Sequence, residues 1–328
     1  MDIFLNTLIN ISPAVISFVI TVLLLHFLPF GKKLLGADRG RKFAVGSEVN
    51  IGKPTGVGFY FIIVIALVTV AFRWMQKEII FTMILLLIAM MTGFLDDRAK
   101  NPWNEYVKGA LDFIIALMGA LIATVYFPKD VMIAVTGTTV HIPAPLYFAL
   151  AVILIIVSIN ATNATDGVDG LSGTLTIIAF FSLNILSVIN KTITSSSLTI
   201  CQVIIGTLFA YLIFNFNPSK MLMGDAGSRA LGLLIAMYAM MVNMPFVYLV
   251  VGLPFLIDGG LSILKITIGR LTKKKVIILK NTLTPIHDHL KKRKGYSVKK
   301  TWLTIVAFGL AVDVIFIGIV ILMRRFGG

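Results

Sequence analysis

Residues 146–163 read LYFALAVILIIVSINATN and contain no charged side chain. A helix of roughly 20 apolar residues is long enough to cross a bilayer, whereas the strands of outer-membrane barrels alternate over about 10 residues. Apolar stretches of similar length recur along the whole chain. The sequence therefore predicts a protein built from membrane-spanning helices.

The composition supports the same interpretation. Of the 328 residues, 58% are apolar and 13% are charged, and the mean hydropathy is +0.95, whereas a soluble domain is about 45–50% apolar and about 25% charged. This composition excludes a soluble enzyme and a nucleic-acid-binding protein, despite a net charge of +14. We expect one integral membrane domain over residues 1–328, with the lipid bilayer around it.

Polar breaks divide the chain into ten predicted spans, so we expect an all-α polytopic membrane protein. The break at Met241–Pro245 could instead be a kink inside one helix, because Pro removes only one backbone hydrogen bond and packing can absorb that loss. The ten predicted spans cover residues 9–30, 57–73, 79–95, 108–127, 146–163, 171–190, 198–215, 228–242, 245–264 and 302–323.

Positive charge predicts the orientation of these spans. Of the 29 Lys and Arg residues, 23 fall in the loops on one face, and such an excess marks the cytoplasmic side. We therefore expect both termini to be external. A single kinked helix over 228–264 would move the positive charges of the last long loop outside, which the rule disfavours. The loops on the predicted cytoplasmic face are 31–56, 96–108, 160–170, 216–229 and 265–301.

Two smaller features carry local predictions. Residues 131–142 on the external face alternate in character about a Thr-Gly turn. This pattern predicts a small β-hairpin with His141 as a solvated residue. Cys201 is the only cysteine and falls in an apolar stretch. We expect it to be a small residue of the core.

The few acidic residues gather on the predicted cytoplasmic face. Each of three short motifs is typical of a helix end or a turn when taken alone. Three of them on one face of a chain with only fifteen acids predict a site for Mg²⁺ and a nucleotide diphosphate, because Mg²⁺ prefers carboxylates, water and phosphate oxygens. The motifs are Gly93-Phe-Leu-Asp96-Asp97, Asn160-Ala-Thr-Asn163-Ala-Thr-Asp166-Gly-Val-Asp169-Gly-Leu and Met223-Gly-Asp225-Ala-Gly-Ser228.

Two further segments belong to this face. The third aspartate motif opens a helix, whose free backbone N–H groups we expect to receive phosphate oxygens. The last loop holds Thr284-Pro-Ile-His287-Asp288-His289, which is a weak zinc pattern. We expect its histidines, on an extended or turned backbone, to be donors to a phosphate or ribose, with a merely solvated loop as the alternative. The basic residues of 265–301 either lie near anionic headgroups or bind an anionic substrate.

These motifs resemble the polyprenyl-phosphate N-acetylhexosamine-1-phosphate transferase superfamily. Thr284-Pro-Ile-His-Asp-His, followed by Lys294-Gly-Tyr-Ser, is similar to the Pro-Ile-His-His-His…Gly-Trp-Ser segment of one branch, phospho-N-acetylmuramoyl-pentapeptide transferase. Pro54-Thr55-Gly-Val-Gly58 is similar to that branch's Pro-Thr-Met-Gly-Gly. The motifs run in the expected order from about residue 50 to 297.

The resemblance implies transfer of phospho-N-acetylmuramoyl-pentapeptide from UDP to undecaprenyl phosphate in the bacterial inner membrane, a Mg²⁺-dependent step of peptidoglycan synthesis that releases UMP. It leaves open whether the enzyme is a homodimer. By motif position, Asp225 and Asp97 are implied metal ligands, and Asp96 and Asp97 supply the base and phosphate contacts. Lys108 faces the phosphates, and His287 acts with it. The remaining implied substrate contacts are Asn163, Asp166, Asp169, Leu222, His289, Lys53 and Thr55.

Several positions depart from the branch pattern. Asp288 replaces the middle of the three histidines, and Leu222 replaces an aromatic residue before Met-Gly-Asp. The lysine expected before Pro-Thr corresponds to either Asn50 or Lys53. Asp258 in the ninth span stands where the branch usually has Glu.

Two other functions stay open at this point. A UDP-N-acetylglucosamine-1-phosphate transferase of the same superfamily would share the aspartate motifs but lack Pro-Ile-His-x-His with Gly-Tyr-Ser. An ion-coupled transporter also uses rare acids, but near the middle of the membrane, where Asp112, Asp258 and Asp313 are expected. The position of the aspartate motifs at the cytoplasmic edge argues against the transporter.

Overall fold

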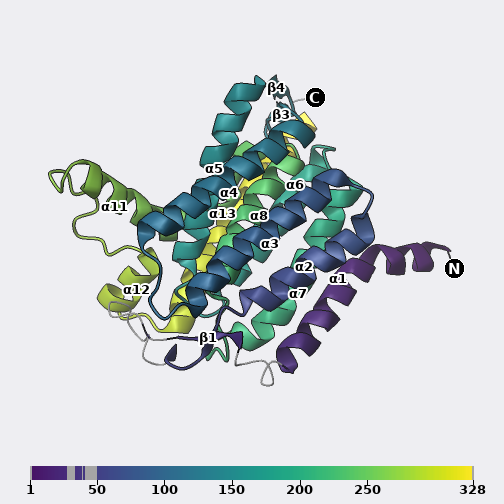
Figure 1. The fold of residues 1–328 in the computed structure, drawn as a ribbon. Helices are drawn as coiled ribbons and strands as arrows, with labels where there is room; N and C mark the ends of the chain where they lie inside the picture. Colours follow the sequence, from purple (N-terminus) through teal and green to yellow (C-terminus); the bar gives the residue numbers. More distant parts are fainter. Residues whose placement is uncertain (1, 28–33, 39, 41–49, 327–328) are drawn as a thin grey trace.

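The computed structural model describes residues 2–27, 34–38, 40 and 50–326, and it is a bundle of long helices (Figure 1). Residues 28–30 of the predicted first span and half of the loop after it, residues 31–33, 39 and 41–49, lie outside the described residues. The long helices of the bundle are α1 (Asp2–His26), α2 (Gly58–Arg73), α3 (Lys77–Arg98), α4 (Glu105–Tyr126), α5 (Ala144–Thr165), α6 (Leu171–Ile189), α7 (Ser195–Asn215), α8 (Gly224–Met241) and α13 (Val298–Phe326).

The multi-pass helical character is confirmed. Among the described helices, α3 to α7 and α13 are long and apolar enough to cross a membrane, and a seventh span results if two bent segments after residue 244 count as one. The apolar part of α1, Ile11–His26, and α2 are shorter apolar helices. Ten crossings and their orientation therefore stay predictions.

The ninth predicted span differs from the expectation. Residues 245–264 were predicted as one helix, but Pro245–Val251 and Leu253–Leu271 meet at an angle of 59°. Pro254 removes a backbone donor at the break, and a π-helical turn follows it. The segments are η3 (Pro245–Val247), α9 (Tyr248–Val251), α10 (Leu253–Phe255), the π-helix η4 (Leu256–Gly260) and α11 (Leu261–Leu271), which stands out from the bundle in Figure 1.

Helix α8 lies at the centre of the protein, and every residue from Ala226 to Met240 is buried. A Cβ atom on Gly93 of α3 would lie 2.3 Å from the backbone oxygen of Asp225, and one on Gly58 of α2 would lie 2.1 Å from the backbone nitrogen of Gly227. Small residues allow helices to approach this closely in a membrane. The two glycines thus hold α2 and α3 against the first turn of α8.

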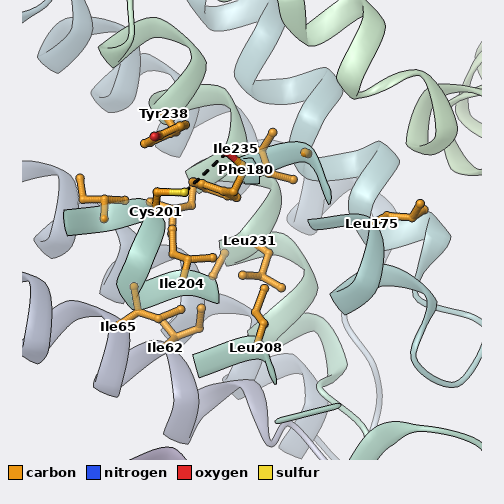
Figure 2. Packing of buried hydrophobic residues seen from close by; sticks show 14 of the residues in the cluster. Ile62, Ile65, Leu175, Phe180, Cys201, Ile204, Leu208, Leu231, Ile235 and Tyr238 are labelled. Carbon is orange, nitrogen blue, oxygen red and sulfur yellow. Dashed lines mark hydrogen bonds between the residues drawn. The ribbon is translucent and has the colours of Figure 1, made fainter. Parts of the chain in front are cut away.

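The interior below this first turn is apolar. Figure 2 shows Cys201 of α7 among side chains of α2, α6 and α8, with its thiol donating to the backbone oxygen of Phe180 at 3.6 Å. Cys201 is 2% exposed. Its predicted place in the core is confirmed.

The predicted hairpin is also confirmed. Strands β3 (Asp130–Met132) and β4 (Thr139–His141) are antiparallel, with Asp130 opposite His141. His141 is exposed, as expected, and its Nδ1 lies 2.7 Å from an oxygen of Asp130. A second ladder, β1 (Gly36–Ala37) with β2 (Pro54–Thr55), was not predicted, because strands of two residues leave no periodic pattern.

The three acids expected in mid-membrane all have partners inside the protein. Asp112 of α4 accepts hydrogen bonds from the guanidinium of Arg229 at 2.5 and 3.1 Å. Asp313 of α13 accepts one from the hydroxyl of Ser182 at 2.6 Å, and Asp258 binds His287. Each acid is thus tied to a neighbouring element.

Candidate active site

The first and third aspartate motifs meet at the start of α8. One carboxylate oxygen of Asp97 accepts the backbone N–H of Asp225 at 3.0 Å, and the other accepts that of Ala226 at 2.9 Å. These N–H groups were expected to bind phosphate, but a carboxylate of the protein itself occupies them. Asp97 caps the helix, because an anion is stabilised by the free N–H groups and the dipole at a helix N-terminus.

Asp225 connects all three motifs. One of its oxygens accepts the amide of Asn163 at 3.0 Å, and the other accepts the ammonium of Lys108 at 2.9 Å. The Asn163 amide also donates to the hydroxyl of Ser228 at 3.0 Å. Both donors favour the ionised form of the Asp225 carboxylate.

Lys108 lies between two carboxylates, because it also pairs with Asp96. The other oxygen of Asp96 accepts the backbone N–H of Trp103 at 2.6 Å. The Asp96 side chain is 5% exposed, while that of Lys108 is 29% exposed. The lysine therefore holds the two acids together and still reaches solvent.

Asp169 has a different position from the other motif acids. Its carboxylate accepts the Asn217 amide at 2.9 Å and both the backbone N–H and the hydroxyl of Ser219, at 3.1 and 2.9 Å. These contacts hold the loop before α8 against the turn after α5. Its carboxylate thus fixes the loop as well as lining the site.

The histidine segment is helical, so the expected extended or turned backbone is wrong. Helix α12 (Ile286–Lys294) begins just after Pro285, which suits the first turn of a helix because proline has no N–H to leave unpaired. The backbone N–H of His287 lies 2.6 Å from one oxygen of Asp258, and its Nδ1 lies 2.8 Å from the other. Both side chains are buried.

The other ring nitrogen of His287 faces the second aspartate motif. A Cβ atom on Gly167 would lie 2.3 Å from its Nε2, so only glycine leaves room for the imidazole there. The aspartate fixes the ring orientation through Nδ1 and leaves Nε2 directed at the turn after α5. His289 instead accepts the backbone N–H of Leu283 at 3.3 Å.

Most of these groups line one cavity of about 730 Å³. Asn163, His289 and Lys53 are not among the described residues that line it, and their implied role as substrate contacts stays a prediction. The Lys53 ammonium binds the side chains of Asn50 and Ser219, at 2.6 and 3.1 Å, and Asn50 itself faces the cavity. The predicted residues that line it are Thr55, Asp96, Asp97, Lys108, Asp166, Asp169, Leu222, Asp225 and His287.

Two lining residues, Asp288 and Lys291, were not among the predicted site residues. Both lie on α12, and helical periodicity would have placed residues 287 and 291 on one face. An extended or turned backbone hides this relation. The sequence marks Asp258 as a rare acid in a span, at a position where the branch usually has Glu, but it gives no sign of the histidine partner.

A second cavity of about 720 Å³ lies beside α11. Its lining combines apolar side chains such as Ile266 and Ile277 with Lys265, Arg270, Lys273 and Lys274. Thr284 lines both cavities. The polar cavity and the cavity beside α11 therefore adjoin.

Comparison with known proteins agrees with this arrangement. The chain is 34% identical over 295 residues to the phospho-N-acetylmuramoyl-pentapeptide-transferase of Treponema pallidum, covering 84% of this chain and 80% of the relative. Proteins of the same name from Lactobacillus acidophilus and Listeria welshimeri are each 30% identical, over 86% and 95% of this chain and 87% and 98% of the relatives. The family model described as "Glycosyl transferase family 4" matches residues 78–243, which hold all three aspartate motifs. The chain is therefore a phosphoglycosyl transferase that belongs to glycosyl transferase family 4.

Proposed function

We propose that this protein transfers phospho-N-acetylmuramoyl-pentapeptide from UDP to undecaprenyl phosphate, giving lipid I and UMP in the first membrane step of peptidoglycan synthesis. The observation that carries the proposal is the convergence of three aspartate motifs, Lys108 and His287 on one cavity. The name shared by relatives over most of the chain supports this branch. The segment bearing His287 supports it as well, because Pro-Ile-His-x-His followed by Gly-Tyr-Ser is similar to this branch.

The proposal includes a topology. Ten spans, with both termini outside and the cavity on the cytoplasmic face of a bacterial inner membrane, would bring the site to a soluble nucleotide donor. The charge distribution supports this orientation, because Lys273 and Lys274, just beyond the end of α11, line the cavity that adjoins the polar site. The whole chain would act as one domain.

Cysteine labelling tests this topology. With Cys201 replaced by Ala, an impermeant thiol reagent is expected to label Lys191→Cys in intact cells and to miss Ser297→Cys until the membrane is permeabilised. The reason is that ten spans place residue 191 outside and residue 297 inside. Labelling of position 297 alone in intact cells would refute the shared cytoplasmic face.

The cavity suits a magnesium ion. Seven aspartates and two lysines line it among the described residues, so a diphosphate would meet excess negative charge without a bound cation. No group of three or more His, Cys, Asp or Glu side chains is preassembled for a metal in the described part of the chain. Mg²⁺ commonly uses one or two carboxylates and takes its other ligands from water and substrate phosphates. Asp225, with Asp97 beside it, would hold the ion, which would stabilise charge on the phosphates.

For the reaction itself, we propose direct attack of the acceptor phosphate on the sugar-linked phosphorus. The second pKa of a phosphate monoester is about 6, so the acceptor is mostly ionised at neutral pH and needs little activation. Asp97 is engaged by two backbone N–H groups, and Asp96 by Lys108 and a backbone N–H. These contacts favour positioning over covalent attack by either carboxylate. Lys108 and His287 would offset the charge of the two phosphates.

The acceptor lipid has a natural place beside the site. The cavity at α11 has apolar walls for a polyprenyl chain, and it shares Thr284 with the polar cavity. We propose that the chain lies along α11 with its phosphate directed toward Asp96 and Lys108.

Within the same superfamily, UDP-N-acetylglucosamine is the alternative donor. Purified protein given Mg²⁺ and undecaprenyl phosphate is expected to release UMP from UDP-N-acetylmuramoyl-pentapeptide much faster than from UDP-N-acetylglucosamine. Release should stop in excess chelator and return when Mg²⁺ is restored. Preferential turnover of UDP-N-acetylglucosamine would assign the protein to the neighbouring branch. The transporter interpretation is displaced by membership of a transferase family.

A further inference from the structure

Helix α12 carries a buried lysine that belongs to none of the family motifs. The Lys291 side chain is 6% exposed and lines the polar cavity. The next three residues of the same helix, Lys292, Arg293 and Lys294, are exposed. A buried ammonium is costly unless it is paired, so the position of Lys291 calls for an explanation that a solvated basic loop does not provide.

The local contacts satisfy this ammonium only in part. Its Nζ donates to the backbone oxygen of Gly167 at 3.2 Å and lies 3.4 Å from an oxygen of Asp288. A lysine ammonium has three N–H donors. Within the described part of the chain it has no further partner, which leaves one donor for a ligand in the cavity.

Position on the helix relates Lys291 to His287. Residues four apart lie on one face of a helix, and these two are the buried residues of α12. Both side chains approach Gly167, His287 through Nε2 and Lys291 through Nζ. The face of α12 that meets the second aspartate motif therefore presents an imidazole and an ammonium together.

The charges of the cavity point to an anionic ligand at this place. Among the described lining residues, the two lysines are Lys108 and Lys291. Lys108 is already held between Asp96 and Asp225, whereas Lys291 faces Asp288 at a longer distance. Lys291 is therefore the less neutralised of the two cations.

We propose that Lys291 binds the diphosphate of the nucleotide-sugar donor, next to His287. This inference rests on the proposed function, because it takes a nucleotide diphosphate sugar as the donor. Asp288 would orient the ammonium from the same helix, three residues earlier. Lys291 would thus keep a positive charge on this face of α12, although Asp288 stands between His287 and His289.

Binding of UDP to the full-length protein in detergent with Mg²⁺, measured by calorimetry, tests the proposal. Lys291→Met is expected to weaken UDP binding tenfold or more, since hydrogen bonds to charged groups contribute on the order of 1.5–3 kcal/mol. Lys291→Arg should recover most of the loss. The matched control Lys292→Met removes an exposed lysine one position away and should bind within about twofold of wild type.

A comparison with uridine separates phosphate binding from a structural ion pair. Uridine lacks phosphate, so it should bind wild type and Lys291→Met equally. Equal weakening for uridine would overturn the proposal. A wild type that binds UDP but does not use the pentapeptide donor would refute the proposed function alone, because UDP carries neither sugar nor peptide.

Discussion

Replacing Asp225 by Asn is expected to lower transfer by about a thousandfold or more while leaving the protein folded. The residue accepts hydrogen bonds from Lys108 and Asn163 and lines the cavity at the first turn of α8. The amide would keep the shape of the side chain but lose the negative charge that would hold Mg²⁺. Loss of a metal's charge stabilisation costs several kcal/mol, and each 1.36 kcal/mol is a factor of ten in rate.

The measurement is UMP release by purified protein, with the unfolding temperature in detergent as a check on folding. Asp130→Asn is the matched control, because Asp130 is an exposed acid of the β3–β4 hairpin and its variant should keep full activity. Near-normal turnover by Asp225→Asn would disprove the assignment. So would full activity of the wild type in excess chelator.

The sequence predicted most of the helices because a membrane span leaves a long, continuous signal. The predicted ranges for α2 to α8 differ from the observed helices by at most four residues at either end, mainly because polar end turns such as residues 224–227 have the composition of a loop. The break at Pro254 was missed, since an apolar stretch carries no information on the angle between its halves. A kink depends on which neighbours satisfy the freed backbone groups.

The sequence predicted that the aspartate motifs lie together on one face. The residues at 96, 97, 166, 169 and 225 do line one cavity, because each lies at a helix end or a turn on the same side of the bundle, and their roles in the reaction stay predictions. What the sequence could not reveal is how the carboxylates divide their roles. Asp97 caps α8 and Asp169 fixes a loop, and such roles depend on partners far away in the chain.

The last loop was predicted least well. Its two histidines look equivalent in the sequence, but helix α12 turns them about 200° apart around its axis, as two residues at 3.6 per turn require. His287 is therefore buried against Asp258, and His289 binds Leu283. The partner of His287 comes from the π-helical turn η4, an element that sequence patterns do not reveal.

This difference between the histidines leads to the second large expected effect. His287→Ala should lower kcat by about a hundredfold, on the order of 3 kcal/mol, which is typical for removing one donor to charge that develops in a transition state. His289→Ala should stay close to wild type, because its ring lies outside the cavity lining. UMP release measured for the two variants side by side provides the comparison, with each serving as the control for the other.

Asp258 extends the same test to the orientation of the ring. Asp258→Asn would keep the volume of the side chain, but its amide could accept from only one of the two N–H groups of His287 that now face the carboxylate at 2.6 and 2.8 Å. We expect Asp258→Asn to lose nearly as much activity as His287→Ala. The double variant should lose little more than either single variant, because the effects of two residues that act through one group are not additive. Additive losses would mean that Asp258 acts independently of the histidine.

Full activity of His287→Ala with loss in His289→Ala would contradict the prediction for the two histidines. It would show that α12 presents its other face to the substrate.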